Sequence, residues 1–167
     1  MATPTSLPAT FVAGNVLTAA QMNALRGAFR ILQVVSATYS TAETTTSSSY
    51  VDTSLTASIT PSSATSKVLA IASVNQLAQR TTANSTGGSH LAIERGGSQL
   101  TDSKLRYYEG GSNDRALSAQ ITLVYLDSPA TTSATTYKVQ HKQSDSGSCT
   151  SFFEDRVGTL TLMEVSA

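Results

Sequence analysis

Apolar and polar residues alternate along most of the chain after Ile31. The clearest segment covers residues 117–126, where apolar side chains fill every second position and hydroxyl or amide side chains fill most of the others. A period of two residues is typical of a strand with one buried face. We therefore predict a strand here, and we expect the same structure for residues 50–60 and 135–142, which alternate in the same way.

Segments with other patterns complete a predicted all-β body. Residues 67–77 begin with the run from Val68 to Ala72, which is apolar on both faces and typical of a central strand. Residues 41–49 are almost entirely threonine and serine, which suits either an edge strand or a loop. Further strands are expected at residues 31–39, 90–95, 98–101, 105–108, 149–153 and 158–165.

Turn and loop signals separate these strands. Gly96-Gly97 predicts a hairpin turn, and a polar loop is expected at residues 80–89, which contain Gly87-Gly88. Within the body, residues 102–106 have a helical tendency. About eight or nine short strands at this spacing predict an all-β fold, a single jelly-roll-like β-sandwich over residues 31–167.

Residues 1–30 follow a different pattern and are predicted to form an N-terminal arm and a docking helix. Thr18 can cap the helix, Gln21 completes a capping box, and Leu17 can pack on Met22. A helix this short is not stable alone, so it must dock. It folds back over an open end of the sandwich, docks onto another protein or packs as a three-helix cluster. The predicted docking residues are Phe11, Val16, Leu17, Met22 and Leu25.

Serine and threonine dominate the polar surface. The 167 residues include 25 serines and 25 threonines, whereas only 13% of the residues are charged. Threonine favours strands through its branched Cβ and serine favours turns, which strengthens the all-β prediction. Aromatic residues make up 6% of the chain and tryptophan is absent, so aliphatic side chains must fill most of the core.

Charge and cysteine content argue against several classes of protein. The formal net charge is zero and no cluster of lysine and arginine occurs, so we expect neither nucleic acid nor a membrane surface as a partner. No stretch approaches the roughly 18 apolar residues of a membrane span. Cys149 is the single cysteine, so it cannot form an intramolecular disulfide or a cysteine-based metal site, and we expect it to fill a strand position.

The residues do not suggest a catalytic or cofactor site. His90 and His141 lie in strand patterns without a second ligand at metal-binding spacing, and structural or surface roles are expected for both. Glu154 and Asp155 are adjacent, and adjacent strand residues point to opposite faces, so these carboxylates converge only if a turn bends the chain. We therefore predict a non-enzymatic protein without catalytic, metal or cofactor-binding residues.

Arg106, Tyr107 and Tyr108 form a candidate recognition loop. They precede Gly110-Gly111, and aromatic side chains beside charged groups on a loop can bind sugars or protein surfaces. Packing within the fold is the simpler expectation for the same tyrosines.

Several stretches resemble bacteriophage structural proteins. The segment FVAGNVLTAAQMN, from Phe11 to Asn23, resembles a segment near the N-termini of phage virion proteins. Residues 31–74, with the stretches YVDT and ITPSSATSKVL, are similar to a β domain of phage tail-fibre and minor structural proteins. The stretches YLDSP, TTYKV and GTLTLMEV resemble motifs with which that domain continues and ends.

The resemblance implies a trimeric, non-enzymatic virion component. We therefore expect a homotrimer in the virion, made in the cytoplasm of the host bacterium and anchored to the capsid or tail by its N-terminal segment. A capsid fibre, a decoration protein and a short tail fibre fit equally well. The alternative is a carbohydrate-binding, host-attachment module of the tail, which would bind a host surface glycan through Tyr107 and Tyr108. An enzyme such as a depolymerase is the least favoured hypothesis.

Overall fold

The computed structural model describes residues 16, 18–19, 31–108, 110–111 and 115–166. Of the predicted docking residues, Phe11, Leu17, Met22 and Leu25 lie outside the described residues. Val16 is described, and 90% of its side chain is exposed. The arm, the docking helix and the division of the chain at residue 30 therefore stay predictions.

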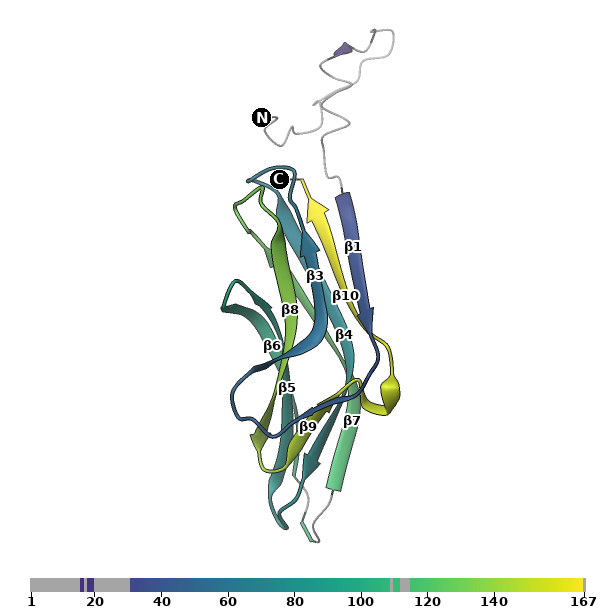
Figure 1. Ribbon diagram of the computed structural model, residues 1–167, viewed down its shortest axis with the longest axis vertical. Coiled ribbons are helices and arrows are strands. Elements are labelled where there is room, and N and C mark those ends of the chain that lie inside the picture. The colour runs from purple at the N-terminus through teal and green to yellow at the C-terminus, as the bar shows by residue number, and fades with distance from the viewer. Residues whose placement is uncertain (1–15, 17, 20–30, 109, 112–114, 167) are drawn as a thin grey trace.

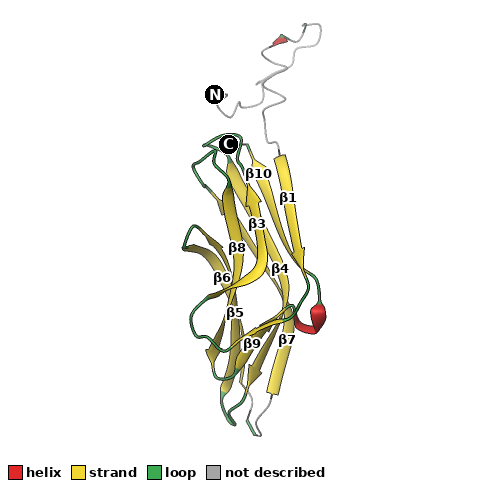
Figure 2. Ribbon diagram, viewed as in Figure 1, coloured by secondary structure: helices red, strands yellow, loops and turns green. Residues whose placement is uncertain are grey.

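Two antiparallel β-sheets form the body (Figure 1). The larger sheet contains β1 (Ile31–Tyr39), β2 (Glu43–Thr45), β4 (Lys67–Arg80), β7 (Arg115–Asp127), β9 (Ser148–Ser151) and β10 (Gly158–Val165). The smaller sheet contains β3 (Val51–Ile59), β5 (Thr86–Arg95), β6 (Ser98–Tyr108) and β8 (Thr135–Asp145). Besides the strands, a short helical turn, η1 (Phe153–Asp155), connects β9 to β10 (Figure 2). The all-β sandwich predicted from the sequence is confirmed.

The central strand of the larger sheet is β4, the longest strand, at 14 residues. One of its edges pairs with β10 and then with β9, and the other edge pairs with β7 along its whole length. On the far side, β1 pairs with β10 and β2 pairs with β9, so the short strands β2 and β9 continue the lines of β1 and β10. The smaller sheet has the order β3-β8-β5-β6.

Apolar side chains from both sheets meet in one core between them. On β3, for example, Leu55, Ala57 and Ile59 are buried, while Thr56 and Ser58 between them are exposed. The core is mainly aliphatic, as the low aromatic content predicted. Its two fully buried rings are Tyr137 and Phe152, and Tyr39 packs edge-on against Phe152 with 5.0 Å between ring centroids.

Three local predictions were wrong. Gly87-Gly88 lie inside β5 rather than in a loop, because Gly87 pairs with Tyr107 and leaves room for its ring; a Cβ on Gly87 would come within 2.5 Å of that ring. The expected helical tendency at residues 102–106 is absent, since these residues pair with β5 as the middle of β6. For the same reason, the two short strands expected at 98–101 and 105–108 are one strand.

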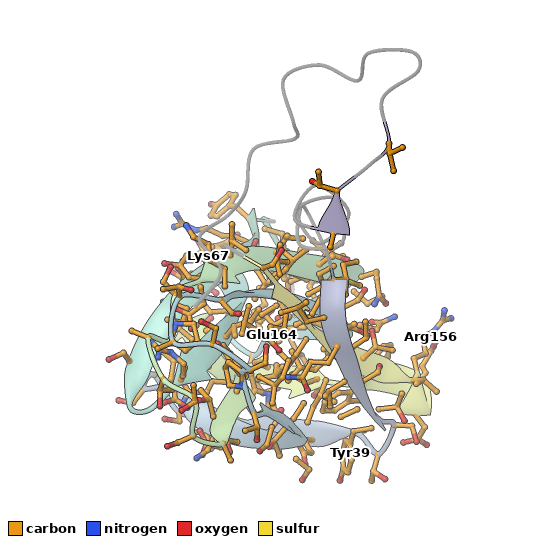
Figure 3. The ribbon with its side chains drawn as sticks, turned by 90° about the horizontal axis from the view of Figure 1, so that it is seen from above. Tyr39, Lys67, Arg156 and Glu164 are labelled. Carbon is orange, nitrogen blue, oxygen red and sulfur yellow. The ribbon has the colours of Figure 1, made fainter. Side chains whose placement is uncertain are left out.

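Two buried carboxylates hold the end of the body at which β1 begins. Glu164 of β10 accepts hydrogen bonds from the backbone N–H and the hydroxyl of Ser62, both 2.7 Å, and from the Gln33 amide at 2.6 Å. Burial alone would raise the pKa of this carboxyl, but these donors outweigh that effect and lower it. Glu164 lies within the body, whereas Arg156 extends from its surface (Figure 3).

Asp127, at the end of β7, is the second buried carboxylate. It accepts a hydrogen bond of 2.7 Å from the Tyr137 hydroxyl and forms an ion pair of 2.8 Å with Arg95. Burial and the Asp127 carboxylate raise the pKa of Tyr137, so its hydroxyl stays protonated and donates. The stretches YLDSP and TTYKV are therefore joined in space, as Glu164 joins GTLTLMEV to the serines of ITPSSATSKVL.

Candidate interaction surface

Metal binding has little support among the residues that the structure describes. Those residues contain no group of three or more histidine, cysteine, aspartate or glutamate side chains that could hold a metal ion. Among the same residues, no helix is long and apolar enough to span a membrane.

One buried polar cluster between the sheets contains the residue types of a nucleophile–base pair. The Sγ of Cys149 lies 3.9 Å from Nδ1 of His141, and that nitrogen lies 2.8 Å from the Ser151 hydroxyl. The Gln76 amide completes the cluster by donating to Ser151 at 3.1 Å and accepting from Ser89 at 2.9 Å. All five side chains are buried.

The protonation states of this cluster argue for packing rather than chemistry. Burial raises the pKa of the Cys149 thiol to about 12, so the reactive thiolate is not formed near neutral pH. Burial also lowers the pKa of His141, and this effect is larger than the opposing effect of the Glu43 carboxylate. The lowered pKa keeps the His141 ring neutral. The strand position predicted for Cys149 and the structural role predicted for His141 fit this arrangement.

The outer face of the smaller sheet is charged. Its first cluster centres on Asp102 of β6, whose carboxylate accepts a hydrogen bond of 3.0 Å from the Tyr50 hydroxyl and lies 3.1 Å from Nδ1 of His90. The Lys142 ammonium stands 4.3 Å from the centre of the Tyr50 ring. The hydrogen bond with His90 makes the largest contribution to lowering the pKa of Asp102. The partial burial of Tyr50 raises the pKa of the Tyr50 hydroxyl.

Further ion pairs extend along the same face. Asp52 of β3 pairs with Lys138 at 2.6 Å and accepts a hydrogen bond of 2.7 Å from Gln140. Asp145 lies 3.2 Å from the Lys104 ammonium and 3.7 Å from the Arg106 guanidinium. These charges are therefore paired with one another across the strands of the smaller sheet.

The structure separates the residues of the candidate recognition loop. All three end β6 rather than occupying a loop, so Arg106 and Tyr108 point outward and Tyr107 points inward. The Tyr107 hydroxyl accepts a hydrogen bond of 3.2 Å from the Arg80 N–H and donates one to the Arg115 carbonyl, which ties β6 to the larger sheet. Only Arg106 and Tyr108, the latter 70% exposed, are open to a partner.

A hollow of about 360 Å³ lies at the other end of β6. Its walls come from the β5–β6 turn and the start of β8, and they include Glu94, Arg95 and Lys138. The Gly97 N–H donates to the Glu94 carboxylate within it. The 11 residues of β6 separate this hollow from Tyr108 by about 30 Å, so the two do not form one site.

The outer face of the larger sheet has a different character. Cross-strand register aligns Val34, Met163, Leu69 and Leu126 in one row across β1, β10, β4 and β7. Ile71 and Val124 are paired in the next row. We call these six residues the apolar face. Val34, Val124 and Leu126 are 55%, 58% and 51% exposed, and the other three are half-buried.

Hydroxyl groups border the apolar face. Ser36 and Thr161 complete the row of Ile71, and their hydroxyls lie 3.2 Å apart. The following row consists of hydroxyl-bearing residues on all four strands, and within it the hydroxyls of Ser73 and Thr122 lie 3.0 Å apart. Among the described strand residues of this sheet, alternation directs one charged side chain outward, that of Lys67 at its end.

The sequence contained part of the signal for this face. The run from Val68 to Ala72 was predicted to be a central strand because it is apolar on both faces, and β4 confirms this, but only the inward residues of the run pack in the core. Finding the rest requires the register of β4 with β7 and β10, which the sequence pattern does not provide.

Comparisons with known proteins give limited guidance. No family model and no curated protein matches the chain. The fold is similar to the T13 particle of infectious bursal disease virus, at 13% identity and a TM-score of 0.39, covering 80% of this chain and 31% of that chain. The Gx strain of the same virus gives 12% identity and a TM-score of 0.34, covering 80% and 36%. The chain thus spans about a third of these proteins, and likeness at this level supports no functional conclusion.

Proposed function

We propose that the chain is a non-enzymatic structural protein of a bacteriophage particle. The observation that carries the proposal is the apolar face of the two-sheet body, which none of the described residues covers. Monomeric soluble proteins rarely expose large contiguous apolar patches, and such patches mark surfaces that contact other proteins. The resemblance of the N-terminal segment and of several β stretches to phage virion proteins supplies the kind of assembly.

The order of the strands supports a jelly roll. With β2 and β9 treated as continuations of β1 and β10, the larger sheet has the order β1-β10-β4-β7 and the smaller has β3-β8-β5-β6. Numbered along the chain, the eight main strands follow the orders 1-8-3-6 and 2-7-4-5. This is the arrangement of two interlocked Greek keys, and jelly rolls occur in viral capsid proteins and lectins. Fold alone does not assign function, so this order adds support only together with the apolar face.

The N-terminal segment anchors the protein in this proposal. Phe11, Val16, Leu17, Met22 and Leu25 bind another virion protein of the capsid or tail, and the β-sandwich projects from the particle as a fibre, decoration or short tail appendage. A homotrimer suits such an anchor, because three weakly binding segments held together bind with much higher effective affinity.

Carbohydrate binding is less well supported. The alternative required both Tyr107 and Tyr108 as a platform, but Tyr107 is engaged between the two sheets. Tyr108 and Arg106 remain on the surface, which is too little aromatic area for a sugar platform by themselves. We therefore propose attachment to the particle rather than to a host glycan.

The test is incorporation into particles. Washed particles from the bacterium that produces this protein are expected to contain it, and immunogold electron microscopy locates it on head or tail. The double substitution Leu17→Asp and Leu25→Asp in the full chain is expected to reduce incorporation at least tenfold, measured by quantitative mass spectrometry. Asn23→Asp, which adds a charge at a polar position of the same segment, is the control and should incorporate normally. Absence of the unaltered protein from washed particles contradicts the proposal.

A further inference from the structure

The apolar face has no cover among the described residues. Its row of four side chains crosses the whole larger sheet, from β1 to the edge strand β7. Three of the six side chains are more than half exposed. Burying such side chains is favourable, so contact of this face with water is costly.

Charge distribution indicates what can cover this face. A partner that recognised the protein through charge would meet the ion pairs of the smaller sheet, not this surface. The apolar face and its hydroxyl border carry no outward charge apart from Lys67 at the margin. Three copies can therefore bring these faces together around a common axis without like-charge repulsion, and the chain as a whole has a formal net charge of zero.

The size and composition of the face also suit contact between copies. β4 has 14 residues and spans about 46 Å, and four neighbouring strand lines cover about 19 Å, so the whole outer face of the larger sheet, of which the apolar face is one part, measures roughly 900 Å². Stable protein interfaces bury about 800 Å² on each partner, with an apolar centre and a polar rim. The two apolar rows and the hydroxyl rows beside them have this composition.

The start of β1 gives a further reason to choose a second copy. Ile31, which is 57% exposed, pairs with Val165 beside the apolar row, and 30 residues precede it in the chain. Copies that meet at this end of the sheet bring their N-terminal segments together. In the proposed function those segments bind the particle, so they are not available to cover the apolar face.

We propose that the apolar face, formed by Val34, Leu69, Ile71, Val124, Leu126 and Met163, is the contact through which copies of this chain join into the homo-oligomer. The inference rests on the proposed virion role for the expected trimer, and it names the surface that builds it. A row of hydroxyl-bearing residues borders the contact on one side, and the charged face of the smaller sheet stays in water.

The experiment measures the mass of the full chain in solution by sedimentation velocity between 1 and 50 μM. The unaltered protein is expected to sediment as three times its 17.4 kDa. The double substitution Val124→Asp and Leu126→Asp places two charges on the apolar face and is expected to raise the dissociation constant at least about a hundredfold. Circular dichroism and a cooperative thermal transition establish that this variant is folded.

The matched control is Thr56→Asp with Ser58→Asp on β3. It adds two charges with the same spacing to exposed positions of an edge strand in the smaller sheet, and it should keep the mass of the unaltered protein. A monomeric unaltered protein overturns the inference, and this is the outcome if the chain's own residues 1–30 cover the face. A folded Val124→Asp and Leu126→Asp variant that keeps its full mass also overturns it, as does equal dissociation of the control. Incorporation into particles is measured separately, so failure of the interface does not by itself contradict the virion role.

Discussion

The two sheets of the sandwich place most of their charged side chains on opposite sides, with Arg95 of the smaller sheet and Lys67 of the larger sheet as exceptions. The smaller sheet directs them outward, where Asp52, Lys138 and Asp102 are paired at the surface. The larger sheet directs them inward, so that Glu164 and Asp127 are buried and held by hydrogen-bond donors. The outer face of the larger sheet is left to aliphatic and hydroxyl side chains. The outer face of the smaller sheet thus suits exposure to water, whereas the outer face of the larger sheet suits contact with another protein surface.

The largest expected difference concerns the carboxylates of the two sheets. Glu164→Gln keeps the shape of the side chain but removes the charge that three donors stabilise, and we expect a loss of about 2 kcal/mol in the free energy of unfolding. Asp52→Asn changes a surface ion pair and should cost less than about 1 kcal/mol. Urea denaturation of both variants at pH 7 measures the difference.

This measurement is best made in the Val124→Asp and Leu126→Asp background, so that dissociation of subunits does not contribute to the apparent stability. Glu154→Gln serves as a further control, because Glu154 is exposed in η1 and pairs only with the neighbouring Arg156. Equal losses for Glu164→Gln and Asp52→Asn would show that the inward and outward charges are energetically alike, against the comparison of the two sheets.

A smaller effect is expected from pH. Because burial lowers the pKa of His141, the unfolded chain takes up a proton below about pH 6.5 that the folded chain does not. The free energy of unfolding should therefore fall as the pH drops from 6.5 toward 5, by at most about 1.4 kcal/mol per pH unit. The lowered pKa values of the Asp52 and Glu164 carboxyls act in a lower pH range. The stabilisation from these two groups is complete above the ordinary carboxyl pKa near 4 and is lost only as the pH falls below it.

His141→Gln is the variant that isolates this effect. Glutamine can still form a hydrogen bond with Ser151 but does not titrate, so the dependence of stability on pH between 6.5 and 5 should flatten. Denaturation curves of both proteins across this range provide the measurement. An unchanged slope in the variant would mean that charges on the outer faces, rather than the buried cluster, control the acid response.

The alternation of residues was sufficient to predict most of the strands but not what each sheet faces. Residues 117–126 and 158–165 became β7 and β10 almost as expected, because hydroxyl and aliphatic residues alternate cleanly there. The same alternation cannot tell an outward aliphatic residue that meets water from one that meets another layer. The run that contains Leu69 and Ile71 was therefore predicted only as a central strand, and the apolar face appeared only when the cross-strand register was known.

The burial of polar residues in the stretches that resemble phage proteins was the second feature that the sequence did not predict. Glu164 and Asp127 gave no sign of burial in the sequence, because their donors come from Ser62 and Tyr137, which lie 102 and 10 residues away. Gly87 misled the prediction in the other direction. Glycine pairs usually mark turns, but here the missing side chain makes room for a ring on the neighbouring strand.

The smallest expected difference separates the two faces of a single strand. Tyr107 and Tyr108 are adjacent at the end of β6. Of these two tyrosines, Tyr107 is the one whose hydroxyl connects the smaller sheet to β4 and β7. Tyr107→Phe keeps the ring against Gly87 and removes that connection, which should cost about 1 kcal/mol in urea denaturation. Tyr108→Phe, on the exposed face, should change stability by less than about 0.5 kcal/mol. If both variants are neutral, the two sheets are held together at this end by packing alone; if Tyr108→Phe costs more, the outward face of β6 is covered by a contact that the isolated sandwich does not contain.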